Sequence, residues 1–249
     1  MTLRLLSYNI RFGGRGREQA LAETIVAAAP DLVVFQEATD PFVIERLAEA
    51  TKFPVWAARQ NHSIGFLSRQ EVDYHEWHYP ADAKHSFMEI VPAGSEARIF
   101  GLHLSSMFSK WSERRRAREI RTLLASIQRY QEGFHVLVGD FNTLAPGEAL
   151  DVRRMPAWIR ALVWLSGRDI QRETIGIMRD ANYIDGYRFL HPDEKGYTFP
   201  VWDPHLRLDY VFVPTAFADR LISCEVIRDP PKVTAASDHF PLLAELNLT

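Results

Sequence analysis

The sequence of 249 residues contains a single cysteine, Cys224, so an intramolecular disulfide cannot form and an oxidising compartment is not required. Cys224 lies in an apolar stretch with no neighbour that would activate a thiolate, which indicates a structural strand residue. No apolar run approaches the roughly 20 residues that span a bilayer, and the N-terminus lacks the pattern of a secretory signal. We therefore expect a soluble intracellular protein, with a cytoplasmic location.

Neither sign of charge predominates in this chain. Lysine and arginine total 29, aspartate and glutamate total 32, and the formal net charge is −3. This balance excludes the strongly basic composition of a non-specific nucleic-acid binder, although a local basic face remains compatible with it. Apolar residues make up 47%, so a large core can form, and disorder, collagen and coiled coil are excluded. With no repeat and no linker, residues 1–249 are expected to form one domain.

Short apolar runs that end in a polar residue recur along the chain, each followed by a loop or a helix. Residues 17–29 have apolar side chains at helical spacing between two such runs, so the chain begins as β-α-β. Mixed strands, helices and hairpins predict a layered α/β fold rather than a purely parallel sheet. The expected strands are residues 3–9, 31–37, 63–68, 87–91, 98–104, 134–138, 208–213, 223–227 and 242–248, and the other expected helices are residues 42–49 and 110–130.

Polar clusters lie at or near the ends of six of these runs. Taken alone, each cluster is more simply interpreted as part of a helix cap or an Asx-turn. Together, if the strand ends converge on one cleft, four carboxylates and two imidazoles there would require a cation. Hard oxygen ligands favour Mg²⁺ or Mn²⁺ over structural zinc. The clusters are Asn9, Glu37, His103, Asp140 with Asn142, Asp209, and Asp238 with His239.

The same clusters stand in the order of the motifs of the endonuclease/exonuclease/phosphatase superfamily, which the sequence resembles from residue 8 to residue 239. The resemblance implies the DNase I-like fold, a four-layered α/β/β/α sandwich of two mainly antiparallel sheets flanked by helices. It also implies a Mg²⁺-dependent phosphoesterase, with Mn²⁺ as a substitute. The matching motifs are Tyr8-Asn9, Gln36-Glu37, Gly101-Leu102-His103, Gly139-Asp140-Phe141-Asn142, Leu208-Asp209-Tyr210 and Ser237-Asp238-His239.

The resemblance implies roles for the residues around the metal and the attacking water. Glu37 corresponds to the principal magnesium ligand, with Asn9 beside it. Asp238 corresponds to a ligand of metal or water near the leaving group. Asp140 corresponds to the residue that orients or deprotonates the attacking water, and Asn142 to a donor to a phosphate oxygen.

Two histidines complete the implied site. Asp209 corresponds to the carboxylate that fixes and charges His239. His103 corresponds to a donor to the phosphoryl oxygens, or to the acid that protonates the leaving oxygen. Glu89, on the preceding strand, is a candidate partner of His103. Imidazoles can donate to developing charge at neutral pH, particularly when paired with a carboxylate.

Three positions indicate the branch of the superfamily. His103 stands where apurinic-site endonucleases usually carry Tyr, and Phe141 stands where tyrosyl-DNA phosphodiesterases usually carry Thr. Leu208-Asp209-Tyr210 lacks the Trp-Cys-Asp-Arg signature of inositol 5-phosphatases. We therefore expect in-line attack of water on a phosphodiester of a small molecule or lipid head group. A nuclease that acts on DNA or RNA is the alternative, and a non-catalytic scaffold is less favoured; a monomer is assumed.

Three further segments are interpreted from their composition. His205 and Arg207 are candidate contacts for substrate phosphate, or exposed strand residues. Residues 112–118 form a basic cluster, which we interpret as a solvated helix face rather than a flank that binds a polyanion. Residues 157–165 are apolar nearly all round, and we expect this helix to pack on the sandwich rather than to form a lid or to meet lipid.

Overall fold

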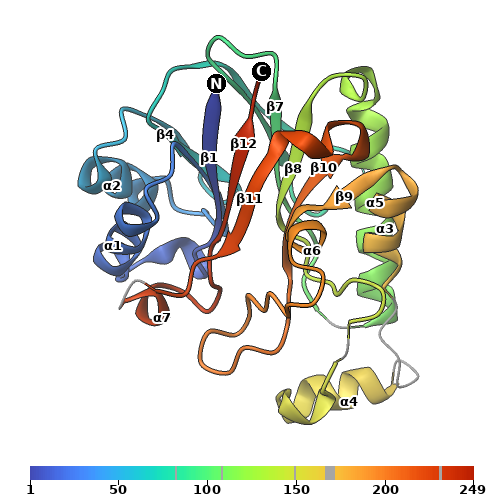
Figure 1. Ribbon diagram of the computed structural model, residues 1–249. Helices are drawn as coiled ribbons and strands as arrows, with labels where there is room; N and C mark the ends of the chain where they lie inside the picture. The colour runs from blue at the N-terminus through green and yellow to red at the C-terminus, as the bar shows by residue number, and fades with distance from the viewer. Residues whose placement is uncertain (82, 108, 149, 166–171, 230–231) are drawn as a thin grey trace.

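The computed structural model describes residues 1–249 except 82, 108, 149, 166–171 and 230–231. Two six-stranded sheets lie face to face, and helices cover the outer face of each (Figure 1). This arrangement confirms the four-layered α/β/β/α sandwich. In order across the first sheet, the strands are β11 (Leu221–Val226), β12 (Leu242–Asn247), β1 (Thr2–Asn9), β2 (Leu32–Gln36), β4 (Gly65–Ser68) and β3 (Val55–Ala57).

The second sheet repeats the pattern of the first. In each sheet one pair of neighbouring strands is parallel, β1 with β2 and β7 with β8, and the other pairs are antiparallel. The sheets are therefore mainly antiparallel, as expected. In order, the strands of the second sheet are β5 (Val72–His78), β6 (Phe87–Pro92), β7 (Arg98–His103), β8 (His135–Asp140), β10 (Asp209–Pro214) and β9 (Tyr183–Asp185).

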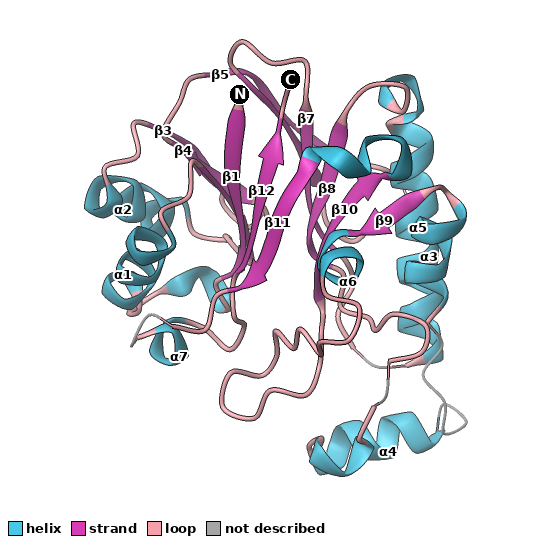
Figure 2. Cartoon of the chain, viewed as in Figure 1, coloured by secondary structure: helices cyan, strands magenta, loops and turns pink. Residues whose placement is uncertain are grey.

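Helices cover both outer faces because each sheet is apolar on both sides (Figure 2). Asp40 and Ser109 cap α2 and α3, each accepting a hydrogen bond from a backbone N–H of the first turn. The long helix expected over residues 110–130 ends at Ser126 and continues as the 3₁₀ turn Gln128–Tyr130. The helices are α1 (Glu18–Ala28), α2 (Pro41–Thr51) and α7 (Val233–Ala236) beside the first sheet, and α3 (Lys110–Ser126) and α5 (Glu173–Asp180) beside the second, with α6 (Gly186–Leu190) after β9.

The core between the sheets is formed by apolar side chains that point inward from both. Val34 and Val138 are fully buried in it, and so is Cys224, the expected structural strand residue. Gly101 lets the two sheets approach, because a Cβ atom at this position would lie 2.5 Å from a methyl carbon of Val34. The close contact fixes how the strand ends of one sheet face those of the other.

Strand register places the predicted polar clusters side by side. His103 at the end of β7 and Asp209 at the start of β10 both lie opposite Asp140. Asn9 at the end of β1 lies opposite Gln36, the residue before Glu37. These strand ends are at the edge of the sandwich that lies opposite the two chain termini (Figure 1).

The helix α4 (Ala157–Leu165) was expected to pack on the sandwich, but the structure shows that it does not. It projects from the body of the molecule, beyond the edge that carries the polar clusters (Figure 1). Only Val163 is buried in it, against a small group that includes Met155 and Leu206. The helix is apolar on both sides, and this group covers one side only. Among the residues described, no helix combines the length and the apolar character that crossing a bilayer demands.

Candidate active site

Asp140 lies at the centre of the site, at the end of β8, and is 1% exposed. Its Oδ2 accepts a hydrogen bond from Asn9 Nδ2 at 3.0 Å, and its Oδ1 accepts one from the backbone N–H of Asn142 at 2.8 Å. The preceding Gly139 has a φ of 149°, and a Cβ there would lie 1.9 Å from the carbonyl oxygen of Leu102. Glycine is therefore required where the strand delivers this carboxylate.

Asn9 and Glu37 come together from the ends of two parallel neighbours, β1 and β2. Asn9 Nδ2 lies 3.3 Å from Glu37 Oε1, and Glu37 Oε2 accepts from the backbone N–H of Phe12 at 2.6 Å. Glu37 has a φ of 58°, an uncommon conformation for a residue with a side chain. The turn aims its carboxylate toward Asn9 and Asp140 rather than along the strand.

Asp209 and His239 form a carboxylate–imidazole dyad. His239 Nδ1 donates to Asp209 Oδ2 at 2.9 Å, and Nε2 lies 3.9 Å from Asp140 Oδ2. Burial by itself would lower the pKa of His239, but the carboxylates of Asp209 and, to a smaller extent, Asp140 and Asp238 together outweigh it and raise the pKa to about 10. The ring of Phe199, 4.8 Å away, closes one side of the imidazole. The dyad therefore holds a cationic donor beside Asp140.

His103 faces Asp140 from the opposite side, with its Nε2 3.8 Å from the same Oδ2. Its Nδ1 is 2.5 Å from Ser63 Oγ, and that Oγ accepts from the backbone N–H of Glu37 at 3.1 Å. The serine proton is thus available for Nδ1, which leaves the ring proton of His103 on Nε2. The expected partner, Glu89, instead pairs with His78 and Arg98.

Ser63 and His85 belong to the site but are not among the predicted residues. The His85 ring stacks on His103 with centroids 5.0 Å apart, and burial lowers the pKa of His85 to about 4. Burial, together with His85, also lowers the pKa of His103. His103 is therefore held neutral whereas His239 is held charged. The only sequence signal for Ser63 is its position just before a buried strand.

Burial, with a contribution from the Asp209 carboxylate, raises the pKa of Asp140 to about 7, although the charged His239 opposes the rise. One ligand atom each from Asp140, Asp209 and His239 lies within 4.8 Å of the others. Carboxylates crowded in this way are stabilised by a cation, and their hard oxygens, with those of Glu37 and Asn9, suit Mg²⁺ or Mn²⁺. The oxygen donors of Glu37 and Asn9, beside the Asp140 carboxylate, therefore fit a divalent metal ion, whereas the charged His239 has no free lone pair to offer one.

Asp238 and Asn142 are beside the cluster but make other contacts. Asp238 Oδ2 pairs with Arg11 Nε at 3.3 Å. Asn142 Nδ2 donates to the carbonyl of Leu104 and to Asp140 Oδ2, both at 3.1 Å. In this arrangement Asn142 orients Asp140, and its donation to a phosphate oxygen stays a prediction.

Arg207 lies in the interior, which contradicts the expectation of a contact that faces substrate. It is 1% exposed, and its guanidinium lies 2.6 Å from Glu148 and 2.6 Å from Asp185. The ring of Tyr210 stacks beneath it, 4.4 Å from the guanidinium carbon. Two carboxylates already neutralise this cation, so it stabilises the fold behind the site.

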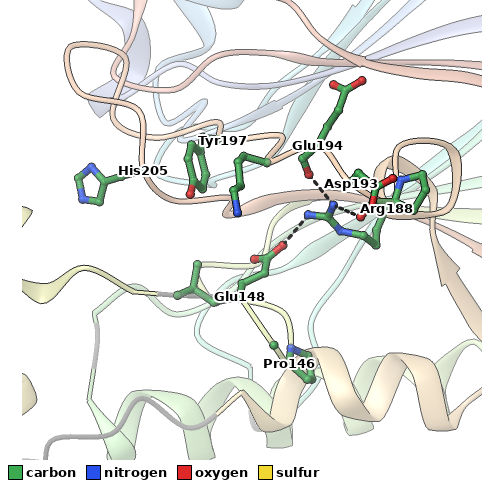
Figure 3. Close-up of a pocket in the computed structure, with 11 residues that line it drawn as sticks. Pro146, Glu148, Arg188, Asp193, Glu194, Tyr197 and His205 are labelled. Carbon is green, nitrogen blue, oxygen red and sulfur yellow. Dashed lines mark hydrogen bonds and ion pairs between the residues drawn. The ribbon is translucent and has the colours of Figure 1, made fainter.

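His205, by contrast, borders a cavity of about 410 Å³ next to the site. Figure 3 shows Tyr197 and His205 on one side of the cavity and Arg188 on the other, with Glu148 between them. Leu144, two residues after Asn142 in the sequence, also lines it, whereas Asp140, His103 and His239 do not.

Replacing Arg207 by methionine should lower the free energy of unfolding by about 2–4 kcal/mol, because Asp185 loses its cationic partner and Glu148, which keeps Arg188, loses one of two. Urea denaturation at neutral pH measures this change. Arg153→Met, which removes an exposed ion pair with Asp151, is the matched control and should have little effect. Equal stability of the two variants would contradict the structural role of Arg207.

The sequence matches the model of the Endonuclease/Exonuclease/phosphatase family over residues 6–239. The chain therefore belongs to this family, and it is an enzyme of the class that hydrolyses phosphoester bonds with a divalent metal ion. A comparison with curated protein sequences gives no match.

Solved structures of three kinds share the fold. An AP endonuclease from Archaeoglobus fulgidus has a TM-score of 0.71 at 17% identity, with 98% of this chain and 99% of that chain covered. The 3'-5' exonuclease NExo from Neisseria meningitidis has a TM-score of 0.70 at 19% identity, with 98% and 100% covered. D. rerio TDP2 complexed with single-strand DNA product has a TM-score of 0.67 at 17% identity, with 99% of each chain covered. At these identities the likeness shows the DNase I-like fold alone.

Proposed function

We propose that this chain is a Mg²⁺-dependent phosphodiesterase that hydrolyses a small-molecule or lipid head-group diester by in-line attack of water. One observation carries the proposal: the Nε2 atoms of His103 and His239 lie 3.8 and 3.9 Å from the same Oδ2 of Asp140. A buried base and two imidazole donors thus face one small volume. Residues 1–249 act as one catalytic domain in this proposal, and the cytoplasmic location stays a prediction.

Asp140 is the proposed general base. Asn9 and Asn142 fix its two oxygens, so one lone pair points at the attacking water. Its raised pKa, about 7, makes it a stronger base than an exposed aspartate while leaving much of it ionised at neutral pH. As the oxygen of the water attacks phosphorus, its proton passes to Asp140, the bond from phosphorus to the ester oxygen on the opposite side breaks, and that oxygen takes a proton from solvent and leaves as the alcohol.

The two histidines donate to the oxygens of the phosphoryl group. His239, charged through its pairing with Asp209, supplies a cationic N–H, and His103 supplies a neutral one from the opposite side. Glu37 and Asn9, with Asp238, are the residues proposed to hold Mg²⁺. When bound, Mg²⁺ neutralises and polarises the phosphoryl oxygens.

The surroundings of the site favour a small or lipid diester over a polynucleotide. Nucleic-acid grooves track phosphates with free cationic side chains. Here Arg15 pairs with Asp40, and Arg154 with Asp203. These arginines, at the rim of the cluster, are already partly neutralised.

A nuclease is the second candidate, and the shared fold favours it. The compared structures include an AP endonuclease, a 3'-5' exonuclease and a TDP2 bound to single-strand DNA product. A chain that acted on DNA would bind it with an affinity that falls steeply as salt rises.

Rates on three substrates distinguish the candidates: bis(p-nitrophenyl) phosphate, p-nitrophenyl phosphate and supercoiled plasmid, each with Mg²⁺, Mn²⁺ or EDTA. We expect metal-dependent cleavage of the diester and an intact plasmid. Plasmid nicking that Asp140→Asn abolishes would establish the nuclease instead, and preference for the monoester would indicate a phosphatase. No activity on any of the three would count against the proposal.

Replacing Glu37 by glutamine should raise the Mg²⁺ concentration for half-maximal rate by about 10- to 100-fold, because the site loses a charged oxygen ligand. A magnesium titration of diester hydrolysis measures this shift. Glu45→Gln, on the surface of α2, is the control and should leave the titration unchanged. An unshifted midpoint in Glu37→Gln would remove this residue from the metal site.

A further inference from the structure

Exposed tryptophans gather at the edge of the sandwich that carries the catalytic cluster. Trp111 follows the end of β7 after a short loop and is 75% exposed. Trp202 lies in the loop before β10 and is 66% exposed, and Trp158 and Trp164 lie on α4 after the end of β8. The start of α3 and the helix α4 both lie at this edge, so exposed tryptophans are carried on the side of the sandwich where the catalytic strands meet (Figure 1).

The helix α4 presents a continuous apolar face to solvent. Trp158, Trp164 and Leu165 are 58%, 60% and 74% exposed. At 100° per residue they fall, with Ala161, on the side opposite Ile159 and Val163, which hold the helix on the body of the protein. An exposed apolar face of this kind marks an interaction surface.

The loop that carries Trp202 makes an ion pair with the segment that precedes α4. Asp203 pairs with Arg154, which lies three residues before the start of α4, so this ion pair ties the loop to the base of the helix. Trp202 and the two tryptophans of α4 therefore lie on segments that this ion pair connects. Asp203 also neutralises the guanidinium of Arg154, as Asp151 does that of Arg153.

These charges decide between two occupants. Stacking of nucleobases on aromatic rings is accompanied by free cations that follow the phosphates, and the guanidiniums of Arg153 and Arg154 are paired. A lipid surface instead takes up tryptophan and leucine together at the level of its head groups. Leu165 suits acyl chains and has no use in stacking, and Arg160 is exposed on the same helix.

We propose that α4, with Trp158, Trp164 and Leu165, docks the protein on a phospholipid surface and brings the catalytic edge to the head groups. The proposal rests on the proposed function in one respect, because it selects a lipid diester as the substrate. Once docked, the protein needs to search only the neighbouring membrane surface for its diester substrate. The cavity that His205 borders lies at the same edge of the sandwich.

Flotation with phosphatidylcholine vesicles tests the docking, and the full chain is used throughout. The triple variant Trp158→Ser, Trp164→Ser, Leu165→Ser should show a partition coefficient at least about 100-fold lower than the unaltered protein. Its rate on soluble bis(p-nitrophenyl) phosphate should stay within about twofold, since none of these side chains contacts the catalytic cluster. Ile222→Ser, which changes an exposed apolar residue on β11 at the other end of the sheet, is the control and should float as the unaltered protein does.

Each outcome of this experiment bears on the docking surface. Failure of the unaltered protein to float, or equal flotation of the triple variant, would overturn it. Binding of a single-stranded oligonucleotide through the same side chains, without flotation, would replace it by base stacking, and dimerisation lost in the triple variant would replace it by a second copy. If the triple variant does not fold, Trp164→Glu alone provides the same comparison. Flotation without diester hydrolysis would leave the docking surface standing and remove the proposed function.

Discussion

Replacing Asp140 by asparagine should lower kcat for a diester by about 10³- to 10⁴-fold, because the attacking water loses its base. Asparagine has nearly the same shape, and its single oxygen still accepts at one of the two carboxylate positions, from Asn9 or from the backbone N–H of Asn142, so KM should change little. Steady-state kinetics with Mg²⁺ measures both constants. Asp219→Asn, an exposed change in the segment Thr215–Arg220, is the control and should be fully active.

The same substitution should also stabilise the fold when metal is removed. Burial raises the pKa of Asp140 to about 7 in the folded chain, above its usual 3.8. The folded state therefore holds this proton where the unfolded state releases it, and stability falls as the pH rises from about 4 to about 7. The neutral amide of the Asp140→Asn variant carries no such cost, so the advantage of the variant in EDTA should grow over that interval. An inactive variant that is also unstable would mean that Asp140 acts through the fold rather than as the base.

Replacing Asp209 by asparagine should lower kcat by about 10²- to 10³-fold, the size expected when one preorganised donor loses its charge. Without the carboxylate, burial dominates and the pKa of His239 falls from about 10. The cationic form is then lost at lower pH, so the alkaline limb of the rate profile should move toward neutral pH. Rates measured across the pH range for both proteins give this shift.

The matched comparison for the dyad is again Asp219→Asn, which should leave the pH profile in place. His239→Asn should resemble Asp209→Asn in kcat, and the double variant should be no slower than either single one, because the two residues act as a unit. A lower kcat with an unmoved alkaline limb would contradict the role of Asp209 in charging His239.

The layered fold and most of the cluster could be predicted because the signal is local. A strand reveals itself by its apolar run, and the residue that ends it is then placed at the sheet edge by the strand's own length. Asn9, His103 and Asp140 end their strands, Glu37 directly follows one, and Asp209 begins an antiparallel strand at the same edge. His239 lies in the turn that leads into β12, so the start of β12 determines where His239 lies.

Other features depend on contacts between distant segments and could not be predicted. Arg207 pairs with Glu148 and Asp185, whose position in the fold is set by loops that lack periodicity. Ser63 belongs to the site only because its Oγ bridges Glu37 and His103, a contact that no local pattern signals. The outward face of α4 was predicted to be packed because apolar residues are usually buried, and no local pattern distinguishes a face that meets the body from one that meets solvent.

The central claim is that this cluster directs water onto phosphorus with the help of a divalent metal ion. Hydrolysis of bis(p-nitrophenyl) phosphate in ¹⁸O-labelled water, with Mg²⁺ and with EDTA, tests it most directly. The account predicts one ¹⁸O in the phosphate monoester, none in the p-nitrophenol, and no labelled product from the protein in EDTA or from Asp140→Asn. Label in the p-nitrophenol, or equal labelling of the monoester with EDTA, would contradict it.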